Sequence, residues 1–132
     1  MAALDTNVLV RYLVQDDERQ LAAASRLIRR CVETNEAMFV PISVSLELEW
    51  VLRSNFKFSK TEVIETLSVL LAADELVFES EGAVELALRW YAHGTADYSD
   101  CMHAALAALA GHQPLWTFDR SASKVDGARL LT

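Results

Sequence analysis

The chain has 132 residues, of which 52% are hydrophobic, and a formal net charge of −7. This length suffices for one domain with a substantial core, and we expect a single domain over residues 1–132. The acidic balance argues against a protein that coats nucleic acid, because phosphate contacts need a basic surface. No run approaches the roughly 18 apolar residues of a membrane span. No leader pattern is visible, so we expect a cytoplasmic location without membrane association.

The first half of the chain predicts an alternation of short strands and amphipathic helices. Apolar residues at helical spacing from Leu21 to Cys31 indicate a helix. Ser43 or Ser45 is expected to cap a second helix, and the stretch SKTE has the pattern of a capping box. The predicted segments are a strand at 2–5, a polar break at 15–17, a helix at 18–34, a strand at 37–43 and the capping box at 59–62.

The second half continues the alternation, with fewer turn residues than usual. Its predicted segments are strands at 76–78, 114–118 and 128–131 and helices at 81–92 and 98–111. Strands that alternate with helices imply a parallel sheet covered on both faces. The fold class is therefore α/β, a three-layer α/β/α sandwich with a central parallel sheet of four to five strands.

Acidic residues follow several of the predicted strands or open the helix that comes next. Ligands bind at this edge of an open parallel sheet. Glu49 and Glu62, by contrast, are expected to be ordinary helix-surface or capping acids. The carboxylates expected at the shared edge are Asp5, Glu47, Asp97, Asp100 and Asp119.

Most of these acids also have a plain structural interpretation. Asp97 is placed to cap a helix, and Asp100 and Glu47 would each complement a helix dipole. Asp119 is placed to cap a short last helix. Asp5 is the hardest to explain in this way, since it stands between two apolar runs.

As a group, the acids predict a cation site. Two carboxylates about 4 Å apart repel each other by roughly 4 kcal/mol at an effective dielectric constant near 20. A divalent cation removes this cost at neutral pH. Ligands that are all oxygen favour Mg²⁺ or Mn²⁺, whereas Zn²⁺ would require Cys or His.

Four stretches of the sequence resemble the landmarks of PIN-domain proteins, and in particular of VapC-type toxin ribonucleases. They are LDTNVLVRYL, VSLELEWVLR, ADYSDCMHAALA and LWTFDR, in the family's order and over nearly the whole chain. The resemblance implies a PIN-like sandwich in which the first strand lies beside the LWTF strand. It thereby implies that Asp5 and Asp119 meet. Cys101 and His103 depart from the family's usual small and aliphatic residues.

The resemblance also assigns roles to individual residues. The catalytic quartet falls on Asp5, Glu47, Asp100 and Asp119, and Asp97 matches a fifth acid. Asp5, Asp97, Asp100 and Asp119 are expected to hold the metal. Polar residues expected to act on substrate or bound water are Thr6, Asn7 and Thr117. Candidates for contacts with the RNA backbone are Arg11, Arg53 and Lys57.

The expected activity is a Mg²⁺- or Mn²⁺-dependent endoribonuclease that hydrolyses phosphodiester bonds in single-stranded RNA. The resemblance further implies the role of toxin in a toxin–antitoxin module, with a VapB-like antitoxin that blocks the active site, and a homodimer. One alternative is a catalytically inactive PIN-like module that binds RNA or protein. Another is an aspartate-based phosphoacceptor signalling domain, although LDTN lacks the paired acids of such domains and PLWTFD ends in acid where they have lysine.

Overall fold

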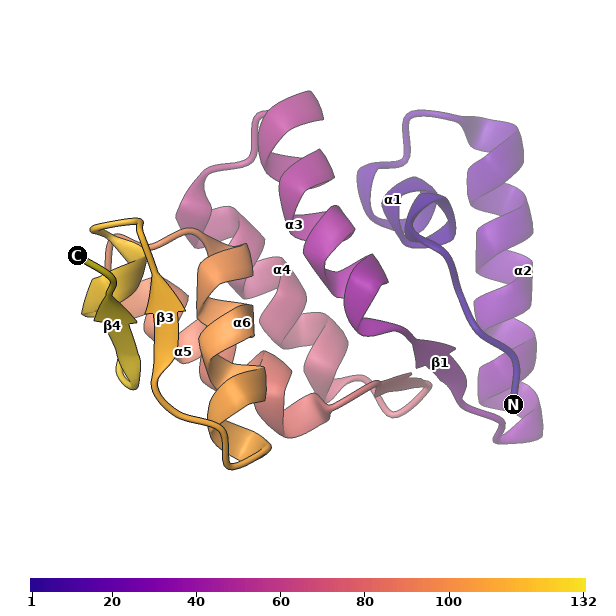
Figure 1. Ribbon diagram of the computed structural model, residues 1–132. Helices are drawn as coiled ribbons and strands as arrows, with labels where there is room; N and C mark the ends of the chain where they lie inside the picture. Colours follow the sequence, from indigo (N-terminus) through magenta and orange to yellow (C-terminus); the bar gives the residue numbers. More distant parts are fainter. The chain divides into compact units, whose positions relative to one another are not determined.

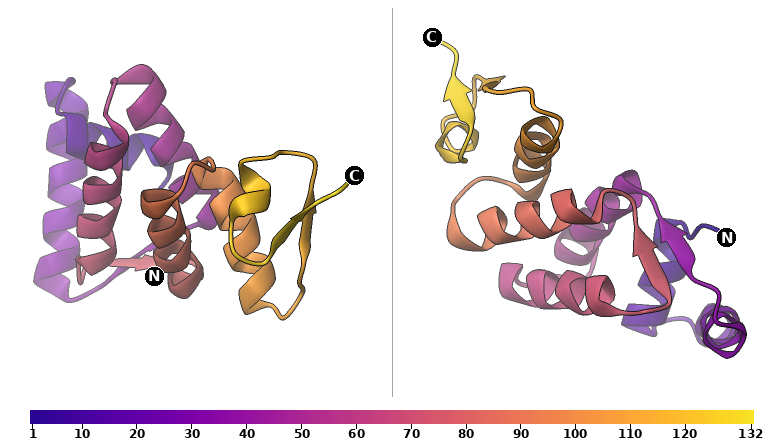
Figure 2. Two further views of the ribbon diagram at one scale, coloured as in Figure 1. Left: turned by 90° about the vertical axis from the view of Figure 1, so that its left-hand side faces the viewer. Right: turned by 90° about the horizontal axis from the view of Figure 1, so that it is seen from below.

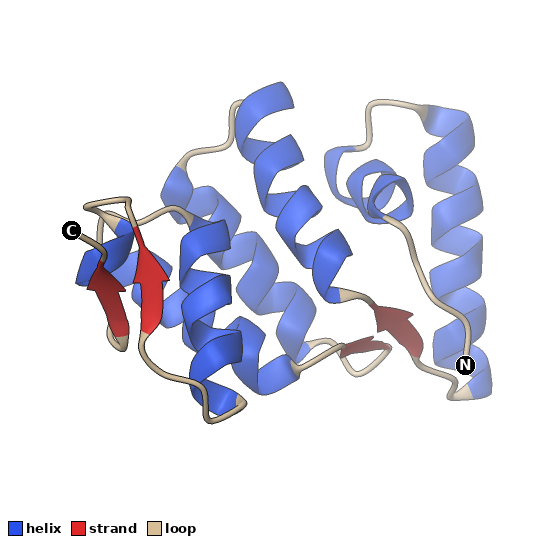
Figure 3. Cartoon of the chain, in the orientation of Figure 1, coloured by secondary structure: helices blue, strands red, loops and turns tan.

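A computed structural model describes residues 1–132, which divide into two compact units, Met1–Glu79 and Ser80–Thr132 (Figure 1). Helices make up most of both units, and all strands are short (Figure 3). None of the helices is both long enough and apolar enough to span a membrane. The mixture of helices with parallel strands confirms the predicted α/β class.

The first unit contains one pair of parallel strands. β1 (Met38–Val40) pairs with β2 (Leu76–Phe78), with Met38 opposite Leu76. The predicted strand at 2–5 is reduced to a single parallel bridge between Ala3 and Phe39. This segment nevertheless lies along β1, because the N–H of Leu4 donates to the Phe39 carbonyl at 2.9 Å.

The helix α1 (Thr6–Val14) was not predicted from the sequence. Asp5 begins it, since a side-chain oxygen of Asp5 accepts a hydrogen bond from the N–H of Val8 at 3.3 Å. The helix then buries Thr6, Leu9 and Val10, which lie three and four residues apart on one face. It ends at Gln15, which adopts a left-handed conformation.

The helix α2 (Glu18–Thr34) has the predicted bounds and packs against α1. The side chain of Asp17 caps it by accepting the N–H of Gln20 at 3.0 Å. Its buried face carries Ala24, Ile28 and Cys31, as the predicted periodicity requires. The thiols of Cys31 and Cys101 are buried and free.

The helix α3 (Ile42–Asn55) begins without the predicted serine cap. Pro41 occupies the cap position, and Ser45 is fully buried inside the helix. The capping oxygen comes instead from Glu79, whose carboxylate accepts the N–H of Ile42 at 2.9 Å across 37 residues of sequence. The backbone N–H of Glu79 also donates to the Val40 carbonyl at 2.9 Å. Glu79 therefore joins the end of β2 to the junction between β1 and α3.

The helix α4 (Lys60–Ala72) begins at the predicted capping box. The Ser59 hydroxyl accepts the N–H of Glu62 at 3.1 Å, and the Glu62 carboxylate accepts the N–H of Ser59 at 2.9 Å. Packing of α4 against α3 closes the core of the first unit. The fully buried apolar side chains on these two helices are Leu48, Leu52, Val63 and Leu67.

The second unit is built on two helices in close contact, α5 (Glu81–His93) and α6 (Tyr98–Leu109). Both carry alanines on their buried faces, and these small side chains allow the helices to approach each other. The rings of Tyr91 and Tyr98 lie 5.5 Å apart, centre to centre, where the chain passes from α5 to α6. The buried alanines are Ala83, Ala87, Ala104 and Ala105.

A second pair of parallel strands completes this unit, and Figure 2 shows both strand pairs from two further sides. β3 (Leu115–Thr117) pairs with β4 (Ala128–Leu130), with Leu115 opposite Ala128. The short 3-10 helix η1 (Ala122–Lys124) connects them. The guanidinium of Arg129 lies over the Trp116 ring, 5.5 Å from its centre.

Candidate metal and catalytic site

The five predicted carboxylates are divided between the two units. Asp5 and Glu47 belong to the first, and Asp97, Asp100 and Asp119 belong to the second. Neither unit by itself assembles three or more His, Cys, Asp or Glu side chains into a group ready to hold a metal ion.

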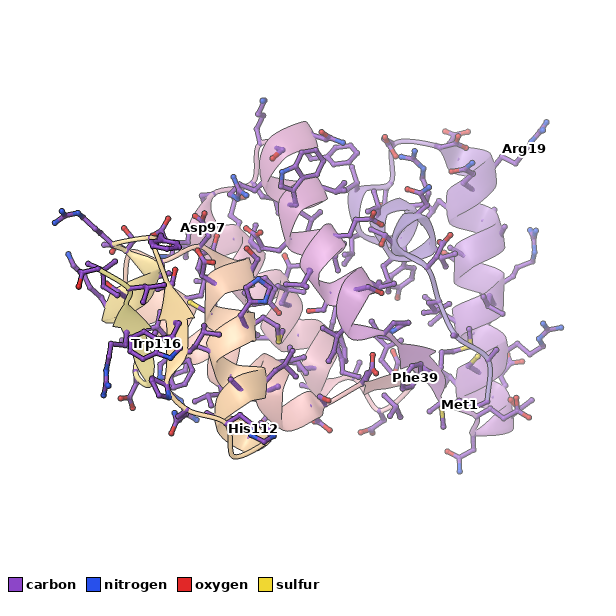
Figure 4. All side chains as sticks on the ribbon, in the orientation of Figure 1. Met1, Arg19, Phe39, Asp97, His112 and Trp116 are labelled. Carbon is purple, nitrogen blue, oxygen red and sulfur yellow. The ribbon has the colours of Figure 1, made fainter.

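Asp97 stands directly before α6, where a capping residue would stand. Its side chain nevertheless makes no capping hydrogen bond with the helix. Figure 4 shows Asp97 at one end of α6 and His112 beyond the other. The expected role of Asp97 as a helix cap is therefore not the one it plays, because its carboxylate accepts no capping hydrogen bond from α6.

Asp100 lies in the first turn of α6, three residues after Asp97, so the two project from the same side of the helix. The pKa of Asp100 is raised above its usual value, first by partial burial and then by the negative charges of Asp119 and Asp97. The positive charge of His103 acts in the opposite direction. The second unit therefore brings the charges of Asp97 and Asp119 close enough to Asp100 to disfavour ionisation of Asp100.

Asp119 is held in a tight turn after β3. Its backbone N–H donates to the Thr117 hydroxyl at 3.0 Å, and its side-chain Oδ1 accepts the N–H of Ala122 at 2.9 Å. Asp119 thus holds the turn that leads into η1, but the cap residue of this short helix is Ser121 and no side chain caps it. Thr117 fixes the backbone of Asp119, which is consistent with a positioning role.

Asp5 has a structural role that sequence analysis did not supply, since it caps α1 through Oδ1. The next residue, Thr6, is buried, and its hydroxyl oxygen has no hydrogen-bond partner. A buried hydroxyl without a partner is costly, and such groups in native proteins often meet a bound ion or water.

Glu47 is exposed on α3, and Glu49, two residues further on, is buried. The expectation of a helix-surface role for Glu49 is wrong. Its Oε2 lies 2.8 Å from Nε of Arg53, one helical turn away. The signal missed was the spacing of four residues from the buried Ser45, which puts both on the inner face of α3.

A pocket of about 350 Å³ lies between α1 and α2. Asp5, Asn7 and Arg11 line it from α1, and Gln20 and Leu27 line it from α2. Asp5, Asn7 and Arg11, which the family resemblance assigns to catalysis or substrate binding, thus line the same pocket.

The three candidate RNA-binding cations already have protein partners. Arg11 binds both oxygens of Asp16, at 2.7 and 2.9 Å, and the Gln20 side chain at 2.6 Å. Arg53 pairs with Glu49, and Lys57 donates to the Ser54 carbonyl at 3.1 Å.

The donor chemistry fits a hard divalent cation. The candidate ligands are carboxylates, with the Thr6 hydroxyl beside one of them, and oxygen donors of this kind suit Mg²⁺, Mn²⁺ or Ca²⁺. Partial burial and then the charges of Asp119 and Asp97 raise the pKa of Asp100. A bound cation would offset the repulsion among these carboxylates. The uncommitted carboxylate of Asp97 adds a further available donor.

Comparison with known proteins identifies the family. The profile of the PIN domain matches residues 2–128, which is nearly the whole chain. The chain belongs to the PIN domain family. It is also similar to the VapC ribonuclease of Aquifex aeolicus (strain VF5). The two are 23% identical over 125 residues, which cover 95% of this chain and 92% of that protein.

Proposed function

We propose that this PIN-domain protein is a ribonuclease that depends on a divalent cation and cuts single-stranded RNA. The observation that carries the proposal is the cluster of Asp97, Asp100 and Asp119, in which partial burial and then the charges of Asp119 and Asp97 raise the pKa of Asp100. A protein has little reason to gather carboxylates in this way unless a cation or a proton compensates them. Similarity to a ribonuclease over nearly the whole chain supports the same activity.

We further propose that residues 1–132 form one domain with a single active site. The match of the PIN-domain profile to residues 2–128 supports a single domain. The resemblance to the PIN family assigns Asp5 and Glu47 to the same site as Asp97, Asp100 and Asp119.

In the proposed mechanism, each residue has a distinct task. Asp5, Asp97, Asp100 and Asp119 would hold the cation, for which Mg²⁺ or Mn²⁺ is the expected identity. When bound, such a cation would supply charge neutralisation at the scissile phosphate and would lower the pKa of a water molecule. Glu47 orients the attacking water, and Thr117 keeps Asp119 in position through its N–H. Thr6 and Asn7 offer hydrogen-bonding groups beside Asp5.

The proposed partners follow from the same site. A VapB-like antitoxin would block the acid cluster, and a basic side chain is suited to this because a guanidinium pairs with carboxylates through two hydrogen bonds. We also propose a homodimer in the cytoplasm.

The test is cleavage of an end-labelled single-stranded RNA by the purified protein. We expect products with Mg²⁺ or Mn²⁺ and none with EDTA. Asp100→Asn should abolish cleavage and keep the far-ultraviolet circular dichroism of the wild type. The matched control is Asp74→Asn, which removes an exposed acid outside the proposed site and should cleave normally.

An inactive RNA-binding or protein-binding module is the competing function. It predicts that RNA is retained in a mobility-shift assay but left intact with either cation. That result, or full activity of Asp100→Asn, would refute the nuclease proposal.

A further inference from the structure

A second pocket lies wholly within the second unit, outside the acid cluster. It has a volume of about 220 Å³ and opens between the end of α5, the loop before α6, and η1 with the residues that follow it. The residues that matter for its chemistry are Trp90, His93, Ala96, Ser121, Lys124 and Asp126.

Two segments that line this pocket continue directly into the acid cluster. Ala96 immediately precedes Asp97, and Ser121 follows Asp119 by two residues. Consecutive Cα atoms are about 3.8 Å apart, so the pocket and these carboxylates are close neighbours. Asp119 also ties the two regions together, since it accepts the N–H of Ala122 at the start of η1. A polymer whose phosphate lies at the acids would have its neighbouring residue within reach of the pocket.

The lining combines a flat aromatic surface with hydrogen-bonding groups. Trp90 is half-buried, which holds its indole in place and leaves part of it accessible. Nδ1 of His93 lies 2.8 Å from the Arg89 carbonyl, which can only accept, so Nδ1 donates. Nε2 of the neutral ring then remains as an acceptor. An unstacked RNA base is recognised by this combination of stacking and hydrogen bonding.

The charges in the pocket favour a base over a bare phosphate. Lys124 and Asp126 both line it, so their charges offset each other within the pocket. A free anion would therefore gain little electrostatic binding energy in this pocket. A nucleotide differs, since its base can occupy the aromatic side while its phosphate meets the exposed Lys124.

We infer that this pocket binds one nucleotide of single-stranded RNA beside the scissile phosphate, with the base against Trp90 and the backbone near Lys124. This inference rests on the proposed ribonuclease function and extends it to the recognition of substrate.

The test is binding measured without cleavage. A fluorescent single-stranded 2′-O-methyl oligonucleotide is titrated with the full chain in EDTA, and anisotropy gives the Kd. Trp90→Ala should weaken binding by about 5- to 150-fold, the range expected for loss of one base–aromatic stack. Trp90→Phe keeps an aromatic face and should retain most of the affinity. Trp50→Ala, which removes an exposed tryptophan of the first unit, is the matched control and should bind normally.

A second variant keeps the inference testable if Trp90→Ala does not fold. Lys124→Gln should reduce the slope of log K against log salt by about 0.7, the contribution of one phosphate contact on a single strand. Arg19→Gln removes an equal charge from the exposed face of α2 and should leave the slope unchanged (Figure 4).

The outcomes separate this inference from the proposed function. Binding that depends on Trp90 in a protein that does not cleave RNA would support the pocket and refute the nuclease. Cleavage by a protein whose binding ignores both Trp90 and Lys124 would refute the pocket alone. Absence of oligonucleotide binding by the wild type would also overturn the inference.

Discussion

Glu79 offers a direct test of how the first unit positions the helix that carries Glu47. Its carboxylate caps α3 at Ile42, and its backbone N–H bonds to Val40. Glu79→Ala removes the capping oxygen but keeps the backbone bond. Loss of a helix N-terminal cap costs about 0.5–2 kcal/mol. Loss of the negative charge near the helix N-terminus adds about 0.3–1 kcal/mol.

The two contributions can be separated by a second variant. Glu79→Gln retains a hydrogen-bond acceptor and loses only the charge, so it should be destabilised by about 0.3–1 kcal/mol. Glu79→Ala should be destabilised by about 1–2 kcal/mol, toward the lower end of the summed range because the site is exposed. For a chain of this length, the loss of stability expected for Glu79→Ala corresponds to a fall in Tm of roughly 3–8 °C.

The assay is urea unfolding followed by far-ultraviolet circular dichroism, with the free energy of unfolding taken from linear extrapolation. Glu85→Ala, at an exposed position of α5, is the control and should change the free energy by less than about 0.5 kcal/mol. If Glu79→Ala unfolds at the same urea concentration as Glu85→Ala, the long-range cap does not stabilise α3 and the reasoning is refuted.

Three further predictions concern caps and acids. The Ser59 N–H and hydroxyl lower the pKa of Glu62 below its ordinary value of 4.5, so the stabilisation by this pair is complete above pH 4.5 and is lost as the pH falls through the lowered pKa; in urea unfolding from pH 6 to 3, Glu62→Gln, which removes the titrating group, should lose that pH dependence. Thr117→Val removes the acceptor for the Asp119 N–H and should lower cleavage by about 10- to 100-fold, whereas Thr117→Ser should stay near wild type; equal rates for both would refute a positioning role. Asp97→Asn should lower cleavage but change the free energy of unfolding by less than about 0.5 kcal/mol, and a larger loss in urea unfolding would show that Asp97 caps the helix after all.

Sequence periodicity predicted those elements whose signals are local. The helix over Glu18–Thr34 and the strand over Leu76–Phe78 lie at their predicted bounds, and the capping box at Ser59 forms as expected. In each case the signal, whether an apolar stripe or a cap, lies within a few residues of the element it specifies.

The elements that were missed depend on a distant contact or on a periodicity that was overlooked. The apolar run after Asp5 was assigned to no element, although Thr6, Leu9 and Val10 have helical spacing. The start of α3 could not be predicted from nearby serines, because its cap is a glutamate distant in sequence.

The candidate site shows a similar division. Chain order alone placed Asp97, Asp100 and Asp119 at related positions, and the second unit brings their charges together. No local pattern distinguishes Asp97, whose side chain makes no capping hydrogen bond, from Asp119, whose Oδ1 accepts the N–H of Ala122.

The turn that holds Asp119 bears on how this residue would bind the cation of the proposed site. Oδ1 of Asp119 accepts the Ala122 N–H and Oδ1 of Asp5 accepts the Val8 N–H, so Oδ2 is the oxygen of each carboxylate without such a bond. Binding through Oδ2 alone would suit a small octahedral ion that retains several waters, whereas Ca²⁺ is commonly bound by bidentate carboxylates in a larger shell. The two hydrogen bonds would thus also bias the protein toward ions of small radius.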